Sequence, residues 1–547
     1  MATLTHPSGE TLFRPGDVLD GFLNAPPLSR RHRIFLLAAL ILLTAAPRLL
    51  LAWQSTVICD DGYYYLSVAR MWQQGQIDAA LSYLNLNTYP LILWGLESAG
   101  LPAPWSYKLW GVFASCLSVL PLFGWVRRLF NDRAAAVAVI LFAVHPEMIE
   151  LSVEPIREAT FWLFFLAAVY VIHRCATSTS RMRGPLAAGL ATAAAIYTRS
   201  EGWVLLVLAG MWFIGLTPAA VTGPRRAQRI ALVFLMIPLF LCLMNVTVLA
   251  QHGRWEWGRF GRLPKIIARL QGDAAPRSSQ TLPATNHAVN AASRPPIANG
   301  NRSDRSLAAA TSEYIRRFGR TFEYFNIVLL IAGLLGCRQK LPRRVFAPPI
   351  LASALVLLGV VALLVVQEDF NGRYFLTPYL LTLPIQTLGL VDLVGRIDDA
   401  TAPWSISRRR RAQIWSGVAM AVAGLFVSQA LTAGHSGRYA QAAWGAQLRA
   451  QFGPIERVET DWESGRIGYH AVGKLPHIIY NRFQKPLAGA ELIITAHPAP
   501  ASFRRRALSY GLTEIPLGDA GEHEYSAFVR TKTSFAQKTN ESSQRVR

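Results

Sequence analysis

The sequence predicts an all-α protein that crosses a membrane many times. Of its 547 residues, 52% are hydrophobic and only 16% are charged, and the mean hydropathy is +0.26. The apolar residues form blocks near the roughly 20 residues that a helix needs to cross about 30 Å of hydrocarbon. About eleven spans are expected, centred on residues 34–53, 106–126, 134–149, 159–173, 185–198, 202–217, 229–250, 325–337, 346–366, 374–394 and 413–432.

Basic residues in alternate loops predict the orientation of these spans. The formal net charge is +22, but Lys and Arg gather in short loops between apolar blocks, which is typical of cytoplasmic loops and contact with anionic lipids rather than of nucleic-acid binding. The sequence therefore predicts a cytoplasmic N-terminus over 1–33 and a membrane domain over 34–432. The loops concerned hold Arg30, Arg127, Arg174, Arg225, Arg338 and Arg408 to Arg411.

Three segments on the opposite, outer side differ in character. Residues 54–105 mix polar and aromatic side chains, which predicts helices lying in the interface. Residues 271–312 contain no aromatic residue, so we expect them to be disordered or to form a lid that orders on binding. Residues 433–530 contain strand-like runs such as Leu492–Thr495, which predicts a small α/β domain outside the membrane, followed by a disordered tail over 531–547.

Two adjacent acids, Asp60 and Asp61, follow the first apolar block. Neighbouring carboxylates repel each other, so each needs a cation, a substrate hydroxyl or water. Beside aromatic residues at a membrane boundary, the pair suggests chemistry on a lipid-borne substrate; the alternative is that the acids only mark a helix end. Two aspartates could hold Mg²⁺ or Mn²⁺, but no recognised spacing of oxygen ligands accompanies them.

A series of short motifs follows the outer ends of the predicted spans. They are Arg48, Asp60-Asp61, Ala69-Arg70, Tyr89-Pro90, Leu129-Phe130, His145-Pro146, Arg157-Glu158, Thr198-Arg199-Ser200-Glu201-Gly202 and Gly372-Arg373-Tyr374. In this order they resemble the GT-C superfamily of polytopic glycosyltransferases, in particular the bacterial group similar to protein mannosyltransferases and aminoarabinose transferases. The resemblance runs through residues 35–215 and recurs at 368–390.

The resemblance implies an enzyme of the bacterial cytoplasmic membrane. Such an enzyme moves a sugar from a polyprenyl-phosphate carrier to a hydroxyl of a lipid, glycan or protein on the outer face, with inversion of the anomeric carbon. The reaction needs a carboxylate to remove the acceptor proton and cations to stabilise the departing phosphate. Asp60 matches the family's first acidic position and is the candidate base. Asp61 stands where the family usually has Glu, so its role as orienter or metal ligand stays open.

Three arginines at outer helix ends are candidates for binding the donor phosphate: Arg70, Arg199 and Arg373. A guanidinium suits bidentate contact with phosphate. We rank Arg373 first because it lies in a tight turn that enters a helix, where backbone donors can join it. The alternative for each arginine is contact with lipid head groups.

Arg48 lies inside an apolar run, where an unpaired guanidinium is costly. We therefore expect a structural ion pair with Asp60, Asp61 or Glu158 rather than a catalytic role for this arginine.

A third acidic motif places Glu150, Glu154 and Glu158 four residues apart, on one face of a helix. Because the family has an acid in this loop, the resemblance favours Glu154 or Glu158 for binding the acceptor or the sugar. The alternative is a solvated helix end. Tyr63 is expected either to stack on a sugar ring or to anchor the chain at the interface.

Two other functions use many of the same features. One is a transporter or flippase of a lipid-linked sugar, and the other is a non-catalytic subunit of an envelope assembly. Transporters tend to carry ionisable groups near the midplane and related halves with broken helices. Here the charges lie at helix ends on one side and no internal repeat is visible, which favours the enzyme.

Overall fold

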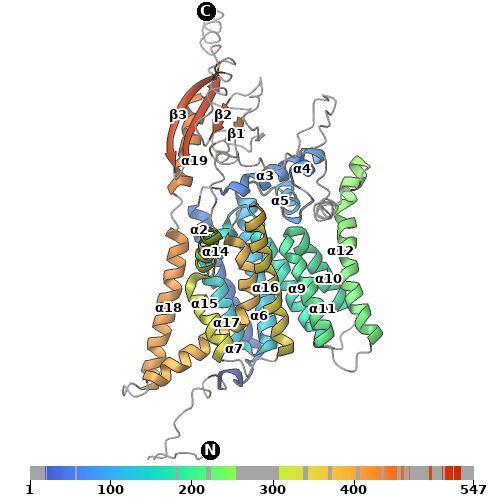
Figure 1. Cartoon of the computed structure of the whole chain (residues 1–547), viewed down its shortest axis with the longest axis vertical. Helices are drawn as coiled ribbons and strands as arrows, with labels where there is room; N and C mark the ends of the chain where they lie inside the picture. The colour runs from blue at the N-terminus through green and yellow to red at the C-terminus, as the bar shows by residue number, and fades with distance from the viewer. Residues whose placement is uncertain are drawn as a thin grey trace, which may run out of the picture.

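The computed structural model describes most of the helical part of the chain and, near the C-terminus, one helix and four strands. The described residues are 19, 21–55, 58–84, 86–178, 183–216, 223–253, 255, 307–336, 343–367, 372–401, 407–432, 436–452, 458–460, 467, 492–495, 505, 508, 512–520 and 523–530. Figure 1 shows the helices as a bundle, with the strands beyond one end of it.

The helices of the bundle match the apolar blocks of the sequence. Each of the eleven predicted stretches overlaps a helix of the described part of the chain. The elements are α2 (Arg30–Gln54), α6 (Trp105–Leu129), α7 (Asp132–Val144), α8 (Pro146–Val153), α9 (Glu158–Ala176), α10 (Arg183–Thr198), η1 (Ser200–Trp203), α11 (Val204–Gly215), α12 (Gly223–His252), α14 (Leu307–Thr321), α15 (Glu323–Gly336), α16 (Arg343–Gln367), η3 (Gly372–Phe375), α17 (Leu376–Thr401) and α18 (Arg408–Thr432).

Fewer helices than the predicted eleven are long enough to span a membrane. Seven of the described helices meet the criteria of length and composition, or up to nine if two bent pairs each count as one span. The pairs are α7 with α8, bent by 61°, and α14 with α15, bent by 84°. Helix α10 has 16 residues, about 24 Å at 1.5 Å per residue, which is short of about 30 Å of hydrocarbon. The multi-pass helical fold class is nevertheless confirmed.

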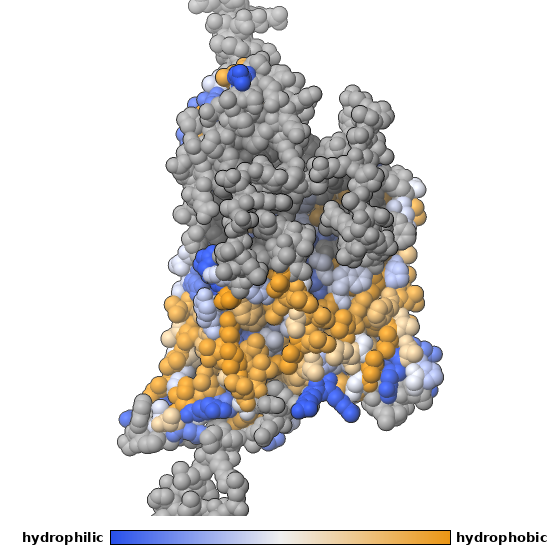
Figure 2. Space-filling model, viewed as in Figure 1, coloured by the Kyte–Doolittle hydropathy of each residue, from blue (hydrophilic) through white to orange (hydrophobic). Residues whose placement is uncertain are grey.

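A band of apolar side chains crosses the face of the bundle that Figure 2 shows. Large apolar side chains such as Phe35, Leu42 and Met420 are 73%, 68% and 70% exposed. Water would make so large an exposed apolar surface unfavourable, whereas lipid makes it favourable. The band therefore fits a protein embedded in a membrane.

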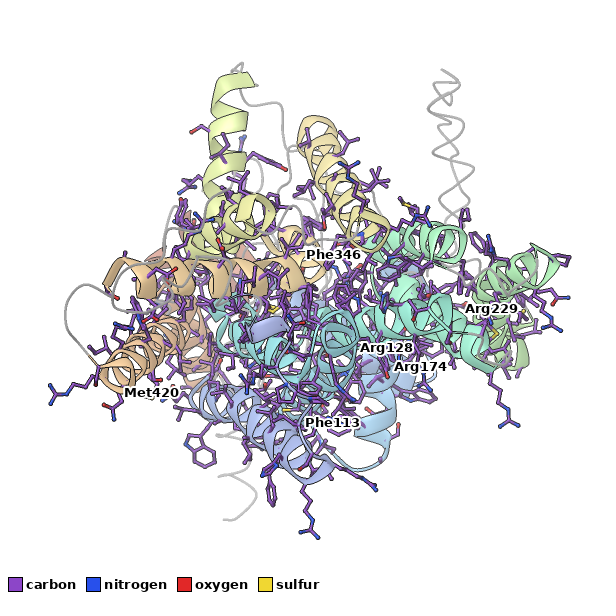
Figure 3. The ribbon with its side chains drawn as sticks, turned by 90° about the horizontal axis from the view of Figure 1, so that it is seen from below. Phe113, Arg128, Arg174, Arg229, Phe346 and Met420 are labelled. Carbon is purple, nitrogen blue, oxygen red and sulfur yellow. The ribbon has the colours of Figure 1, made fainter. Side chains whose placement is uncertain are left out.

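The end of the bundle away from the strands carries basic side chains. Arg128 and Arg174 lie in the last turns of α6 and α9, and Figure 3 views them, with Arg229, from that end. Arg229 is 4% exposed, and its Nη1 donates to the carbonyl oxygens of Cys175 and Ser178 at 2.9 Å each, which caps α9. This is the end that the sequence predicts to face the cytoplasm, and the orientation remains a prediction.

Three short helices, α3 (Asp60–Gln73), α4 (Ile77–Tyr83) and α5 (Thr88–Ser98), cover the other end of the bundle (Figure 1). They account for the helices predicted in the first outer loop. Trp72 and Leu81 pack into a buried cluster that also contains Ile237 of α12. The same cluster contains Ile196 of α10, so the last turns of α3 pack against α10 and α12.

The C-terminal part forms a four-stranded sheet beside α19 (Ser436–Phe452), at the same end as α3 to α5 (Figure 1). The strand order is β1-β2-β4-β3, with β1 parallel to β2 and the other pairs antiparallel. The sequence predicts three of these strands but not β3, because Pro516 and Gly518 interrupt its alternation and cause a shift of register. The strands are β1 (Val458–Thr460), β2 (Leu492–Thr495), β3 (Leu512–Ala520) and β4 (His523–Arg530).

The prediction that residues 271–312 are disordered is wrong for the last six of them. Residues 307–312 form the start of α14, since the Ala-rich stretch there favours a helix. Residues 271–306 and 531–547 lie outside the described residues. The predicted domain limits, 34–432 and 433–530, remain predictions.

Candidate functional site

Five charged side chains of alternating sign meet at the end of the bundle that α3 covers. In order of contact they are Asp61, Arg373, Glu158, Arg199 and Glu201, and we refer to them as the charge chain. They come from α3, η3, α9 and the link between α10 and α11. The fold thus brings together residues that lie up to 312 positions apart in the sequence.

Glu158, the first residue of α9, lies at the centre of the charge chain because both Arg199 and Arg373 contact it. Its Oε1 accepts a hydrogen bond from Arg199 Nη1 and lies 3.3 Å from Arg373 Nη1. The side chains of Glu158 and Arg199 are only 1% and 2% exposed. Two opposite charges so far from water depend on each other, since either one alone would be a buried, unpaired ion.

Arg199 is enclosed by its partners. Besides Glu158, its Nε donates to Glu201 Oε1 at 3.0 Å. Its guanidinium also lies 5.3 Å from the ring centre of Tyr374 and 5.8 Å from that of Phe161, within range of cation–π attraction. In this state Arg199 links two carboxylates, and its predicted contact with a phosphate remains a prediction.

The Asp61–Arg373 pair forms the more accessible end of the charge chain, with the two side chains 24% and 15% exposed. Burial raises the pKa of Asp61, but the charge and hydrogen bond of Arg373, with Arg157 and Arg199 nearby, outweigh burial and lower that pKa below its usual value. Asp61 is therefore ionised at neutral pH. An ion-paired carboxylate of low pKa is a weak base, which points to an orienting role for Asp61.

Asp60 is the first residue of α3, and its side chain lies outside the described residues. Its predicted role as the base therefore remains a prediction. Among the side chains that the structure describes, no group of three or more His, Cys, Asp or Glu residues could hold a metal ion. The suggestion of Mg²⁺ or Mn²⁺ depends on Asp60 and stays open with it.

Three other predicted site residues lie outside the charge chain. Arg70 is in the last turn of α3, about 13 Å along the helix from Asp61, and its charge acts on Glu97 of α5. Glu154 follows the last residue of α8 and is 7% exposed. Tyr63 is 1% exposed, so protein encloses its ring, which disfavours both predicted roles, stacking on a sugar and anchoring at the interface.

The predicted ion pair of Arg48 is wrong. Arg48 is fully buried, and its Nη1 donates to the carbonyl oxygens of Thr44 and Ala143 at 2.9 Å each. Its guanidinium also lies 5.5 Å from the ring centre of Phe142, and none of its partners among the described residues is an acid. Helix α7 ends at Val144, so the Ala143 carbonyl lacks a helical donor and can accept from the guanidinium instead.

Sequence reasoning missed Glu201 and Arg157 as site residues. Both were visible as charged neighbours of predicted residues, in the segments 157–158 and 198–202, but spacing alone does not show which neighbour points inward. The Arg157 guanidinium lies 5.8 Å from the ring centre of Tyr65. Burial raises the pKa of Tyr65 to about 12, so this tyrosine keeps its proton at neutral pH.

Comparisons with known proteins match both the sequence and the fold. A family model described as dolichyl-phosphate-mannose-protein mannosyltransferase matches residues 100–250, which include Glu158, Arg199 and Glu201. The crystal structure of ArnT from Cupriavidus metallidurans bound to undecaprenyl phosphate matches 92% of this chain and 99% of its own, with a TM-score of 0.53 and 14% identity. The chain resembles GT-C glycosyltransferases. This confirms the resemblance predicted from the ordered motifs.

Two further GT-C structures match with lower scores. Archaeal oligosaccharyltransferase AglB from Archaeoglobus fulgidus, in complex with an inhibitory peptide and a dolichol-phosphate, has a TM-score of 0.46 at 11% identity, covering 91% of this chain and 74% of that one. Arabinofuranosyltransferase AftD from Mycobacteria has a TM-score of 0.43 at 14% identity, covering 93% and 40%. No curated protein matches the sequence.

Proposed function

We propose that the protein is a membrane glycosyltransferase that takes a sugar from a polyprenyl-phosphate carrier. The observation that carries the proposal is the charge chain. It places a partly accessible arginine and an ionised aspartate together at one end of the bundle, where they could meet a lipid phosphate and a sugar. The fold shared with ArnT, whose structure holds undecaprenyl phosphate, supports this kind of donor.

In this proposal Asp60 removes the proton from the acceptor hydroxyl. The hydroxyl oxygen then bonds to the anomeric carbon from the side opposite to the phosphate, which inverts that carbon. The bond between the anomeric carbon and the phosphate oxygen breaks, and its electron pair stays on that oxygen. Asp61 stays ionised beside Arg373 and orients the reacting groups, since its lowered pKa makes it a weak base.

Arg373 stabilises the departing phosphate in this proposal. As the glycosidic bond breaks, negative charge grows on the phosphate, and a guanidinium in place beforehand stabilises that charge more than it stabilises the bound donor. Asp61 and Glu158 hold the guanidinium from two sides. Arg199 compensates the charge of Glu158, so Arg373 can turn toward a phosphate without leaving a buried carboxylate alone.

The acceptor is a hydroxyl of a lipid, a glycan or a protein, and we place the reaction on the outer face of the bacterial cytoplasmic membrane. The C-terminal sheet lies at the same end of the bundle as the charge chain (Figure 1), so it is well placed to meet a large acceptor.

Mass spectrometry of lipid-linked sugars and envelope glycans tests the proposal in cells that lack the protein. One sugar-charged carrier should accumulate and one glycan should lose a sugar. The wild-type gene should restore the glycan, and Asp60→Asn at equal protein level should not. Unchanged lipid and glycan profiles would contradict the proposal, and loss of carrier movement across the membrane would favour a transporter.

A further inference from the structure

Two breaks between helices meet beneath the turn that carries Arg373. One break separates α7 from α8 at His145, and the other separates α14 from α15 at Phe322. A buried hydrogen bond of 2.9 Å joins them, between His145 Nε2 and the carbonyl oxygen of Thr321. A bend in one helix pair is thus fixed to a bend in the other.

The hydrogen bonds of His145 define which of its ring nitrogens carries the proton. Its Nδ1 accepts a hydrogen bond from the backbone N–H of Met148 at 3.4 Å, so Nε2 carries the proton and donates it to Thr321. The ring lies 4.5 Å from that of Tyr379, measured between ring centres. Thr321 is thereby tied to His145, whose ring in turn packs against α17.

The Thr321 side chain continues the connection toward the charge chain. Its hydroxyl donates a hydrogen bond to the carboxylate of Glu147. Gly372 lies directly against this pair, because a Cβ atom at Gly372 would come within 2.6 Å of Thr321 Oγ1 and 3.8 Å of Glu147 Oε1. The turn η3 therefore begins on the Thr321 hydroxyl, with no room for a side chain between them.

Helix α14 closes the other side of η3. The rings of Tyr314 and Phe318 lie 5.2 and 5.1 Å from that of Phe375, between ring centres and in edge-to-face geometry. With Gly372 fixed at one end and Phe375 at the other, the direction of Arg373 in between is determined by the residues beneath and beside the turn.

We propose that Thr321 and Glu147 are positioning residues for Arg373. They hold Gly372 in place, so that the guanidinium of the following residue, Arg373, points toward Asp61 and Glu158. The structural part of this inference stands on the contacts alone, whereas its effect on sugar transfer rests on the proposed function.

The test compares four variants with the wild type in lipid nanodiscs. Thr321→Val keeps the shape of the side chain but removes the hydroxyl, Thr321→Ser keeps the hydroxyl, and Glu147→Gln keeps a hydrogen-bonding group. The matched control is Thr387→Val, which removes a buried hydroxyl from α17 that donates to the Leu383 carbonyl at 2.9 Å, away from η3.

Thr321→Val should lower kcat/KM for the donor by about 10-fold, because a misplaced Arg373 stabilises the transition state less well. The KM for the acceptor should not change. Thr321→Ser and Glu147→Gln should keep most of the wild-type kcat/KM, and Thr387→Val should match the wild type. Unfolding midpoints of the four variants close to that of the wild type would show that the proteins are folded.

Cryo-electron microscopy of wild type and Thr321→Val separates this inference from the proposed function. The variant should show Gly372 displaced and Arg373 turned away from Asp61 or Glu158. An unmoved Arg373 together with unchanged donor kinetics would overturn the inference. A wild-type protein that transfers no sugar would refute the proposed function instead, and the two maps would still decide whether Thr321 positions Arg373.

Discussion

The two ends of the charge chain differ in their access to solvent. At one end, Asp61 and Arg373 are 24% and 15% exposed, whereas Arg199 and Glu201 at the other end are 2% and 9% exposed. An exposed pair can exchange its partner for a ligand at little cost, but a buried pair cannot separate without leaving an unpaired ion in the protein. We therefore propose that the Arg373 end binds the ligand and that the Arg199 end supports it.

The largest expected effect is on stability, at the buried end. Arg199→Gln should lower the free energy of unfolding by about 3 kcal/mol, because it leaves Glu158 and Glu201 with less compensation in the interior. The matched variant Arg373→Gln should cost less, because Arg199 still compensates the buried Glu158 and the Asp61–Arg373 pair is partly exposed. Thermal unfolding in detergent micelles measures both, and equal losses would remove the distinction between the two ends.

The second prediction concerns Asp60, beside the accessible end. Asp60→Asn keeps the size of the side chain but cannot accept a proton, so turnover should fall by at least about 10²-fold. Donor binding should change little. Steady-state kinetics on folded, purified protein checks this, with Asp78→Asn in α4 as the control. Near-normal turnover would move the base to Asp61 or to Glu154.

A smaller effect is expected for Arg373→Lys. Lysine keeps the positive charge but loses the planar pair of N–H donors, so turnover should fall by about 10-fold if the phosphate contact is bidentate. Arg373→Ala should lose more. Donor affinity and turnover for both variants, with Arg70→Lys for comparison, measure the effect. Wild-type values for both Arg373 variants would make Arg70 the better candidate for phosphate.

The smallest expected effect is a pH dependence at Asp61. Its pKa in the folded protein is below the ordinary value of 3.8, so the stability that it adds is complete above that value and is lost as the pH falls through the folded pKa. The difference in unfolding midpoint between wild type and Asp61→Asn should stay constant from about pH 8 to pH 5 and shrink only in stronger acid. A difference that shrinks near neutral pH would mean that Arg373 does not lower this pKa.

Most of the fold could be predicted because apolar blocks of spanning length determine where helices form. The bend at His145 also has a local signal, the proline that follows it. Helices α10 and α11 are too short to span by themselves, which hydropathy alone does not reveal. Strand β3 was missed because Pro516 and Gly518 break its pattern.

The candidate site was harder to predict than the fold. The sequence indicated Asp61, Glu158, Arg199 and Arg373 one by one, but not their pairing, since no local pattern joins residues from four separate segments. Arg48 shows the same limit. A buried arginine needs partners, but the sequence does not show that a backbone carbonyl at a helix end can replace a carboxylate.

The most direct test of sugar transfer uses the purified protein in nanodiscs. It is mixed with a lipid extract from cells that lack the protein, because such an extract should contain the accumulated donor. Mass spectrometry follows the carrier during incubation with an acceptor extract. We expect the wild type to convert the glycosylated carrier to free polyprenyl phosphate, and Asp60→Asn to leave the carrier charged. A carrier that keeps its sugar in the presence of the wild-type protein would contradict the account.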